Sequence, residues 1–88
     1  MELFFSKKFL KQLAKLPPNP RRQIEEFVFT RLSQCETIAA TGKIEKMKGY
    51  PNFFKARFGV YRVGFEMSGD KLIIRTVLHR KEIYRFFP

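Results

Sequence analysis

The hydrophobic pattern of the chain changes period once, and this change limits the fold more than any other feature. Apolar side chains recur at helical spacing as far as Leu32 and mainly at every second position from Phe53 onward. Helices that precede a run of strands are typical of α+β domains, in which the helices pack on one face of an antiparallel sheet. With 88 residues, no repeat and no long linker, residues 1–88 are expected to form a single domain.

The N-terminal part is expected to form a strand and a helical hairpin. The first five residues, MELFF, are rich in β-forming side chains, and Ser6 can cap a following helix. The proline cluster at 17–20 ends that helix because proline has no amide donor, and Asn19 with Pro20 makes a favourable cap and first position for a second helix. The apolar stripes of the two helices comprise Phe9, Leu10, Leu13 and Leu16, then Ile24, Phe27, Val28 and Leu32.

Residues 35–42 are expected to form a loop that ends at a glycine, and three strands follow it at 53–58, 60–67 and 71–78. Tight turns between these strands predict an antiparallel meander. The third strand is apolar on both sides, as a central strand would be. Alternation in the first two strands predicts one apolar face and one face that carries Lys55, Arg57 and Arg62.

Charge is the first indication of function. Eighteen Lys and Arg against eight Asp and Glu give a formal net charge of +10, and residues 43–88 hold eleven of the basic side chains. An excess this large repels itself in the compact state and indicates an anionic partner. Three cations on neighbouring strands also repel one another unless an anion lies among them. A solvated face of long cations is the alternative interpretation.

The sequence contains no pattern typical of a membrane or secreted protein. It has no run of about 18 apolar residues, which a membrane-spanning helix would need. The charges at the N-terminus are in the wrong order for a signal peptide. Cys35 is the only cysteine, so no disulfide can form within the chain and a reducing cytoplasm is the expected location.

The last twelve residues, VLHRKEIYRFFP, crowd basic and aromatic side chains together: His79, Arg80, Lys81, Tyr84 and Arg85. A short helix from Arg80 would keep Arg80 and Tyr84 one turn apart. That helix would also turn three apolar side chains toward the body of the protein: Ile83, Phe86 and Phe87. Since the segment follows the central strand, His79 and Arg80 are expected to lie near Lys55 and Arg57.

Clustered Lys, Arg and Tyr side chains are suited to phosphodiester chemistry without a metal. The acids of the C-terminal half are scattered, so neither a metal-ligand set nor a cofactor is expected. RNA supplies its own nucleophile, the 2′-OH, and the protein then needs to provide positioning, proton transfer and charge stabilisation. A lysine or a tyrosine is a possible general base.

Two stretches, KGYPNFFKARFGVYRVGFE at 48–66 and HRKEIY at 79–84, resemble the RelE/ParE superfamily of bacterial toxin–antitoxin toxins. The resemblance implies the RelE-like β-α-α-β-β-β-(α) fold, with the helical hairpin on one face of a small twisted sheet. The RelE branch consists of mRNA interferases. Their reaction is a 2′-OH attack that leaves a 2′,3′-cyclic phosphate without metal, commonly in the ribosomal A site. The ParE branch shares the fold and poisons DNA gyrase.

The resemblance also implies roles for individual residues. Lys55 matches the first of the paired basic residues on its strand, and Arg57 matches the second, with a charge-stabilising role because arginine cannot act as a base at accessible pH. Arg62 would hold the scissile phosphate. Arg80 would stabilise the transition state or leaving group, and Tyr84 would stack on a base or orient the 2′-OH.

His79 stands before Arg80, where the superfamily commonly has a histidine, so the general base stays open among Lys55, Tyr84 and His79. The remaining RNA contacts are expected from four further basic residues: Lys46, Lys48, Lys81 and Arg85. The resemblance implies an acidic or amphipathic cognate antitoxin that covers the basic surface, in a toxin–antitoxin hetero-oligomer. The alternatives are a ParE-like gyrase inhibitor without nuclease activity and a small RNA-binding module without catalysis.

Overall fold

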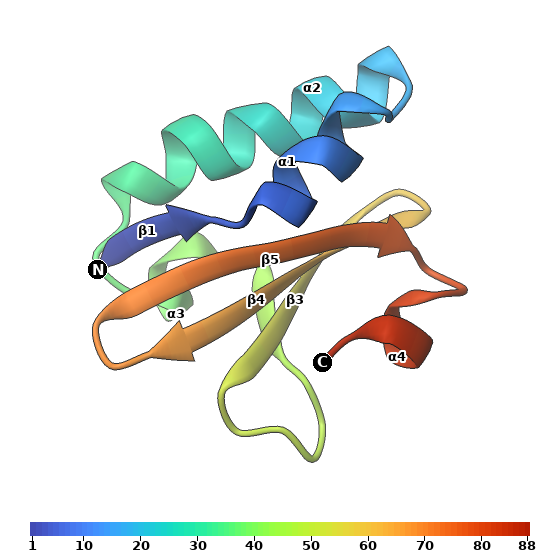
Figure 1. The fold of residues 1–88 in the computed structure, drawn as a ribbon. Helices are drawn as coiled ribbons and strands as arrows, with labels where there is room; N and C mark the ends of the chain where they lie inside the picture. Colours follow the sequence, from blue (N-terminus) through green and yellow to red (C-terminus); the bar gives the residue numbers. More distant parts are fainter.

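The computed structural model describes residues 1–88 and has the expected α+β architecture, with two helices on one side of a sheet and a short C-terminal helix on the other (Figure 1). The elements are β1 (Glu2–Phe5), α1 (Lys7–Ala14), α2 (Pro18–Glu25), η1 (Glu26–Arg31), η2 (Leu32–Gln34), α3 (Ile38–Thr41), β2 (Ile44–Lys46), β3 (Phe53–Phe58), β4 (Tyr61–Ser68), β5 (Lys71–His79) and α4 (Ile83–Phe86).

Ser6 begins α1 as expected. Its Oγ accepts a hydrogen bond from the Phe9 amide at 3.0 Å, and its hydroxyl donates to the carbonyl oxygen of Arg75 at 2.7 Å. The cap therefore ties the start of α1 to β5 as well as satisfying a helix amide. Phe9 and Leu13 are buried, but Leu10 is exposed, which corrects the predicted stripe. The short helix presents only a narrow row of side chains to the sheet.

The second helix begins earlier than the Asn19–Pro20 pair predicted. Pro17 occupies the cap position without a side-chain hydrogen bond, and Pro18 is the first helical residue, so Asn19 lies inside the first turn. Pro17 has no side-chain acceptor, and Pro20 at the third position has no amide to donate, so the helix starts without a side-chain cap. The helix continues through the π-helical η1 and the 3₁₀ turn η2. Its predicted stripe is buried: Ile24, Phe27, Val28 and Leu32.

The segment predicted as a loop, 35–42, contains a helical turn, and an additional strand follows it. Thr37 caps α3 by accepting from the Ala40 amide at 3.2 Å, and Gly42 ends it with a positive φ of 66°. The next three residues form β2, which pairs antiparallel with β3 and was not predicted. Elements of three or four residues are too short to show a period, so the sequence pattern could not reveal them.

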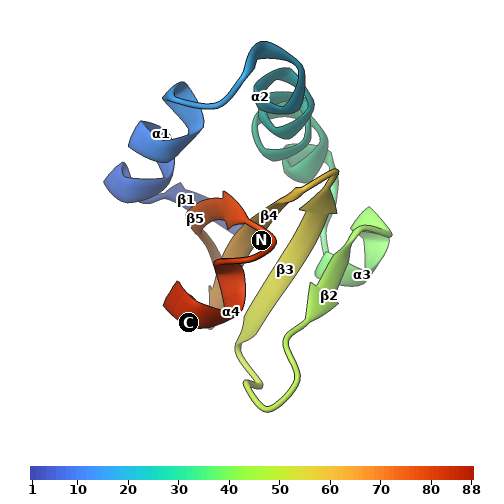
Figure 2. The ribbon, with the colours of Figure 1, turned by 90° about the vertical axis from the view of Figure 1, so that its right-hand side faces the viewer.

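The five strands form one mixed sheet in the order β1-β5-β4-β3-β2. β3, β4 and β5 make the predicted antiparallel meander; β5 is an inner strand between β1 and β4, and the central strand is β4. β1 pairs with β5 in parallel, with Glu2 opposite Lys71 and Phe5 opposite Ile74. Figure 2 shows α1 and α2 together over one face of this sheet.

A β-bulge in β5 reverses the alternation of its side chains. Phe65 pairs with Ile74 while Gly64 pairs with Thr76, so Arg75 is an extra residue without a partner in β4. Before the bulge Ile74 faces the helices, and after it Val77 does. Each side chain after the bulge therefore faces the opposite side of the sheet from the one that simple alternation from Ile74 predicts.

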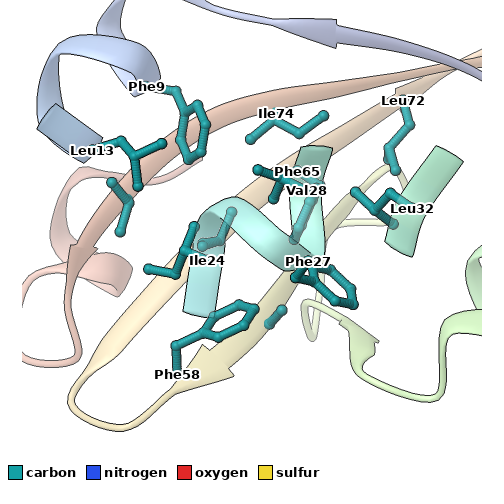
Figure 3. Packing of buried hydrophobic residues seen from close by; sticks show 13 residues of the cluster. Phe9, Leu13, Ile24, Phe27, Val28, Leu32, Phe58, Phe65, Leu72 and Ile74 are labelled. Carbon is teal, nitrogen blue, oxygen red and sulfur yellow. The ribbon is translucent and has the colours of Figure 1, made fainter. Parts of the chain in front are cut away.

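The main core lies between the two long helices and the sheet (Figure 3). Phe27 packs edge-on against Phe58 with ring centroids 5.5 Å apart, and Phe9 from α1 lies over the β5 side of the sheet. The thirteen buried members are Phe9, Leu13, Ile24, Phe27, Val28, Leu32, Ala56, Phe58, Val63, Phe65, Leu72, Ile74 and Val77.

β1 pairs only with residues 71–74 of β5, and a side chain of α1 supplies the hydrogen-bond acceptor for the next part of this strand edge. Gln12 Oε1 accepts hydrogen bonds from the Thr76 hydroxyl at 2.7 Å and from the Val77 amide at 3.0 Å. Thr76 is only 2% exposed, so water cannot replace this acceptor without a rearrangement. The glutamine thus takes the place that a further strand would occupy.

We predict that Gln12→Leu lowers the free energy of unfolding by about 2 kcal/mol, because it leaves two buried donors on β5 without an acceptor. Chemical denaturation followed by circular dichroism measures the change. Gln23→Leu is the matched control, because Gln23 is exposed and should alter stability by no more than about 0.5 kcal/mol. Equal losses in the two variants would contradict the role given to Gln12.

The C-terminal segment packs on the opposite face of the sheet. Met47, Ile83 and Phe87 form a second, separate buried cluster, with Phe53 and Leu78 against it. Two expectations are corrected here. The helix starts at Ile83 and not at Arg80, and Phe86, which was expected to pack on the body of the protein, is 52% exposed. The helix also ends at Phe86, and Phe87 is extended, so Ile83 and Phe87 meet the sheet while Phe86 turns outward. None of the helices is long and apolar enough to cross a membrane.

Candidate functional site

The sheet face opposite α1 and α2 carries the three strand cations predicted from the sequence. We call it the cationic face; its residues are Lys55 and Arg57 of β3 and Arg62 of β4, with α4 lying across it. The strand register sets Arg57 directly opposite Arg62 and Lys55 directly opposite Gly64. Side chains on paired residues of antiparallel strands share one face, so all three cations point the same way.

Lys55 and Tyr84 are in contact although 29 positions separate them in sequence. The Lys55 amino group donates a hydrogen bond to the Tyr84 hydroxyl, and its Nζ lies 4.6 Å from the centroid of the tyrosine ring. Tyr84 is 66% exposed, so its ring remains available to a partner. The contact depends on the docking of α4, because nothing else brings Tyr84 to β3.

Arg57 and Arg62 would repel each other across the strand pair, and each is held by a different partner. Arg57 Nε lies 3.6 Å from Glu45 Oε1, a carboxylate that β2 brings beside β3. Both side chains of this ion pair are more than half exposed, so it contributes little to stability. The acids of the C-terminal half are scattered in sequence, and the unpredicted strand β2 brings one of them, Glu45, to Arg57.

The Arg62 guanidinium folds back onto the β3–β4 turn. Its Nη1 donates to the carbonyl oxygens of Gly59 at 2.8 Å and Tyr61 at 2.9 Å. Both bonds come from one nitrogen, so Nη2 and Nε keep their donors for another acceptor. Arg62 is therefore oriented by backbone oxygens while retaining a pair of donors, the arrangement by which an arginine can bind an oxyanion.

Arg80 lies at the end of the sheet where the β3–β4 turn holds Arg62. His79, the residue before it, is not on the cationic face. The Arg80 amide donates to the carbonyl of Val60 at 2.7 Å, which fixes the turn after β5 beside the β3–β4 turn that holds Arg62. Beyond the bulge, His79 is paired with Tyr61 on the helix side of the sheet. Its Nδ1 accepts from the Lys81 amide at 3.1 Å, so this ring supports the turn that carries Arg80.

Four further basic residues were predicted to bind RNA, and one of them, Lys46, is paired with Phe54 and so points to the helix side of the sheet, away from the cationic face. All four are exposed: Lys46 in β2, Lys48 in the following turn, Lys81 before α4 and Arg85 within it. The Arg85 guanidinium carbon lies 5.2 Å from the centroid of the Phe86 ring. No group of three or more His, Cys, Asp or Glu side chains lies together in a way that could hold a metal ion.

The chain is similar over most of its length to known toxins. The family model of the ParE toxin of the type II toxin–antitoxin system parDE matches residues 3–84. Toxin RelE3 of Methanocaldococcus jannaschii is 38% identical over 92 residues, and the alignment covers all of both chains. The chain belongs to the RelE/ParE toxin superfamily. It is a RelE-like toxin of a type II toxin–antitoxin system.

Solved structures agree with this assignment. The toxin superposes on the RelB–RelE antitoxin–toxin complex from Methanococcus jannaschii with a TM-score of 0.78 and 37% identity, covering 97% of this chain and 99% of that one. The RelBE2 toxin–antitoxin complex from Mycobacterium tuberculosis gives a TM-score of 0.66 at 26% identity, with 90% and 96% covered. The fold predicted from the resemblance is thereby confirmed.

Sequence reasoning missed two residues that shape this site of the toxin. Glu45 lies beside Arg57 only because residues 44–46 form β2, and a strand of three residues is too short to show a hydrophobic period in the sequence. Gly64 stands inside β4 between Lys55 and Thr76, with the Phe87 ring against it. An isolated glycine within a strand pattern often indicates a close approach of another group, and this signal was present in the sequence.

Proposed function

We propose that this toxin is an mRNA endoribonuclease that cleaves by attack of the ribose 2′-OH on the adjacent phosphate, without a metal ion. The O2′–P bond forms as the P–O5′ bond breaks, which leaves a 2′,3′-cyclic phosphate on one fragment and a 5′-OH on the other. The proton of the 2′-OH passes to a base, and the departing O5′ takes up a proton. The contact between Lys55 and Tyr84, beside the opposed Arg57 and Arg62, is the observation that carries the proposal.

The roles follow from chemistry and position. Lys55 and Tyr84 are in contact and can each give and take a proton, whereas the arginines of the cationic face stay charged at any accessible pH. We assign the general base to this pair. His79 is a weaker choice because the register places it on the other face of the sheet.

The arginines supply charge stabilisation. Arg62, with free donors on Nη2 and Nε, would hold the scissile phosphate, and Arg57 would add positive charge beside it. Arg80, next to the same turn, would stabilise the leaving oxygen. The exposed Tyr84 ring offers a stacking surface for one base of a single-stranded RNA, worth about 1–3 kcal/mol.

The partners follow from charge and from the relatives. With a net charge of +10, the toxin should bind RNA through phosphate contacts, with Lys48, Lys81 and Arg85 extending the surface and Lys46 at the β2 edge of the sheet. Two of the similar structures are toxin–antitoxin complexes with RelB-type partners. We propose that an acidic cognate antitoxin covers the cationic face in a hetero-oligomer, and that the free toxin acts in the cytoplasm on mRNA in the ribosomal A site.

A second function is favoured by one observation, the match to the ParE family model. A toxin of that branch would inhibit DNA gyrase and cut no RNA. In that case the contact between Lys55 and Tyr84 would have no catalytic meaning, and activity would survive the loss of either side chain.

Mapping of RNA ends tests the proposal and separates the two functions. Brief expression in cells should produce new 5′ ends inside translated frames, and Arg80→Ala should lower their yield by about 100-fold, the cost of losing one donor to the developing charge. Arg22→Ala removes an exposed arginine from α2 and should leave the cleavage pattern unchanged.

A gyrase supercoiling assay runs in parallel with the same variants. Blocked supercoiling without new RNA ends would assign the toxin to the gyrase-directed branch and remove the catalytic roles given above. If neither effect appeared while RNA still bound, the chain would be an RNA-binding module without catalysis.

A further inference from the structure

The C-terminal helix is held by a small cluster that is separate from the main core. Ile83 and Phe87 are the two buried side chains of this segment, and they pack with Met47, Phe53 and Leu78. None of these residues belongs to the thirteen-residue core beneath α1 and α2. Apart from its own contact with Lys55, the position of Tyr84, which lies between Ile83 and Phe87 in sequence, therefore depends on this cluster.

Gly64 forms the floor on which the Phe87 ring rests. A Cβ built on Gly64 would lie 2.7 Å from Cε2 and 2.8 Å from Cδ2 of Phe87, closer than real Cβ atoms approach other atoms. Its φ is not among the positive values found at other glycines of the chain, so a special backbone conformation does not explain it. Glycine weakens the interior of a strand, so its presence here matches the close approach of the ring.

The ring is also held from the side. Phe53 of β3 packs edge-on against it, with centroids 5.5 Å apart and planes at 79°. The Phe87 amide donates to the Ile83 carbonyl at 2.9 Å, which joins the ring to the end of α4. The strand register then connects this ring to the site, because Gly64 is the direct partner of Lys55, whose amino group bonds Tyr84.

We propose that Phe87 seated on Gly64 is a latch that positions Tyr84 against Lys55, so that Gly64 and Phe87 are positioning residues of the site. The effect of the latch on RNA cleavage rests on the proposed function, whereas its effect on α4 does not. The match to the family model ends at Tyr84, so Phe87 lies beyond the part of the chain that the model describes.

Gly64→Ala tests the latch directly. The added methyl group should displace Phe87 and not β4, because β4 is hydrogen-bonded to strands on both sides, whereas Phe87 follows a four-residue helix that packs only through the small cluster. Hydrogen exchange should show faster exchange at the amides of Arg85, Phe86 and Phe87, with the amides of β4 and β5 unchanged. The kcat for cleavage of a short RNA should fall about 100-fold, as expected for a misplaced catalytic group.

Compensation distinguishes positioning from a general loss of stability. Phe87→Leu in the Gly64→Ala background leaves room for the new methyl group while keeping an apolar anchor, so it should restore both amide protection and most of kcat. Ser68→Ala, at the exposed end of β4, is the matched control and should change neither. If Gly64→Ala does not fold, Phe87→Ala removes the ring without touching the sheet and should give the same loss of protection and kcat.

The latch and the nuclease function can fail separately. Unchanged protection at Arg85–Phe87 in Gly64→Ala would overturn the latch, whatever the wild type does to RNA. Faster exchange with unchanged kcat in a wild type that cleaves RNA would overturn the positioning role. A wild type that cleaves no RNA would overturn the proposed function, and the exchange measurement would still decide whether Phe87 and Gly64 hold α4.

Discussion

Replacing Lys55 with arginine is expected to lower kcat for RNA cleavage by about 10²–10⁴-fold, the usual contribution of a positioned general base or acid. KM should change only a few-fold, because arginine keeps the positive charge that attracts RNA. Arginine also keeps the stacking of a cation on the Tyr84 ring, now 4.6 Å from Lys55 Nζ, but cannot release a proton at accessible pH. Single-turnover cleavage of a defined RNA measures the effect.

Two further variants make the result specific. Tyr84→Phe keeps the exposed ring for base stacking and removes the hydroxyl that accepts from Lys55. If only Lys55→Arg loses activity, lysine handles the proton, and if both lose it equally, the pair acts as a unit. Lys71→Gln removes an exposed lysine at the start of β5 and is the control for a simple loss of charge. Full activity in Lys55→Arg would limit Lys55 to electrostatics.

The period of the hydrophobic pattern predicted most of the fold. Helical spacing identified the stripe of α2 and its continuation, from Ile24 to Leu32, and alternation identified the three long strands to within a residue or two. These segments are long enough for several periods, and burial in one core enforces them. The parallel pairing of β1 with β5 carries no signal of this kind, because it depends on where α1 and α2 return the chain.

The site was predicted less completely, because it depends on short elements and on one irregularity. Alternation from Ile74 would have put His79 on the cationic face, and the extra residue at Arg75 turned it toward Tyr61. The carboxylate beside Arg57 required β2, a strand of three residues. The helix α4 is a single turn that ends at Phe86, so Phe86 is exposed, while Ile83 and Phe87 are buried as expected.

The two faces of the sheet divide stability from the proposed chemistry. One face and the two long helices contain the main core, whereas the cationic face holds only the small cluster beneath α4. Cations that would repel one another are therefore placed where the fold depends on them least. The separation also means that variants of the cationic face can be compared at nearly constant stability, which the kinetic predictions require.

Arg62→Gln is expected to reduce RNA cleavage by about 10²–10³-fold, the loss measured when one donor to a developing charge is removed. It should also reduce the slope of log K against log salt concentration by about 0.7, the contribution of one phosphate contact with a single strand. Both effects have one physical cause: Nη1 is fixed on the carbonyls of Gly59 and Tyr61, so Nη2 and Nε keep the donors that we propose bind the scissile phosphate.

The control for Arg62 is Arg75→Gln, which removes the same charge from a neighbouring strand. Arg75 Nη1 is already paired with Glu66 Oε1 at 3.0 Å, so it should contribute less to RNA binding and nothing to the chemical step. Equal losses in the two variants would mean that the protein attracts RNA by net charge alone. A large loss of cleavage only in Arg62→Gln, with a binding change of one phosphate contact, would mean that Arg62 acts on the phosphate that reacts.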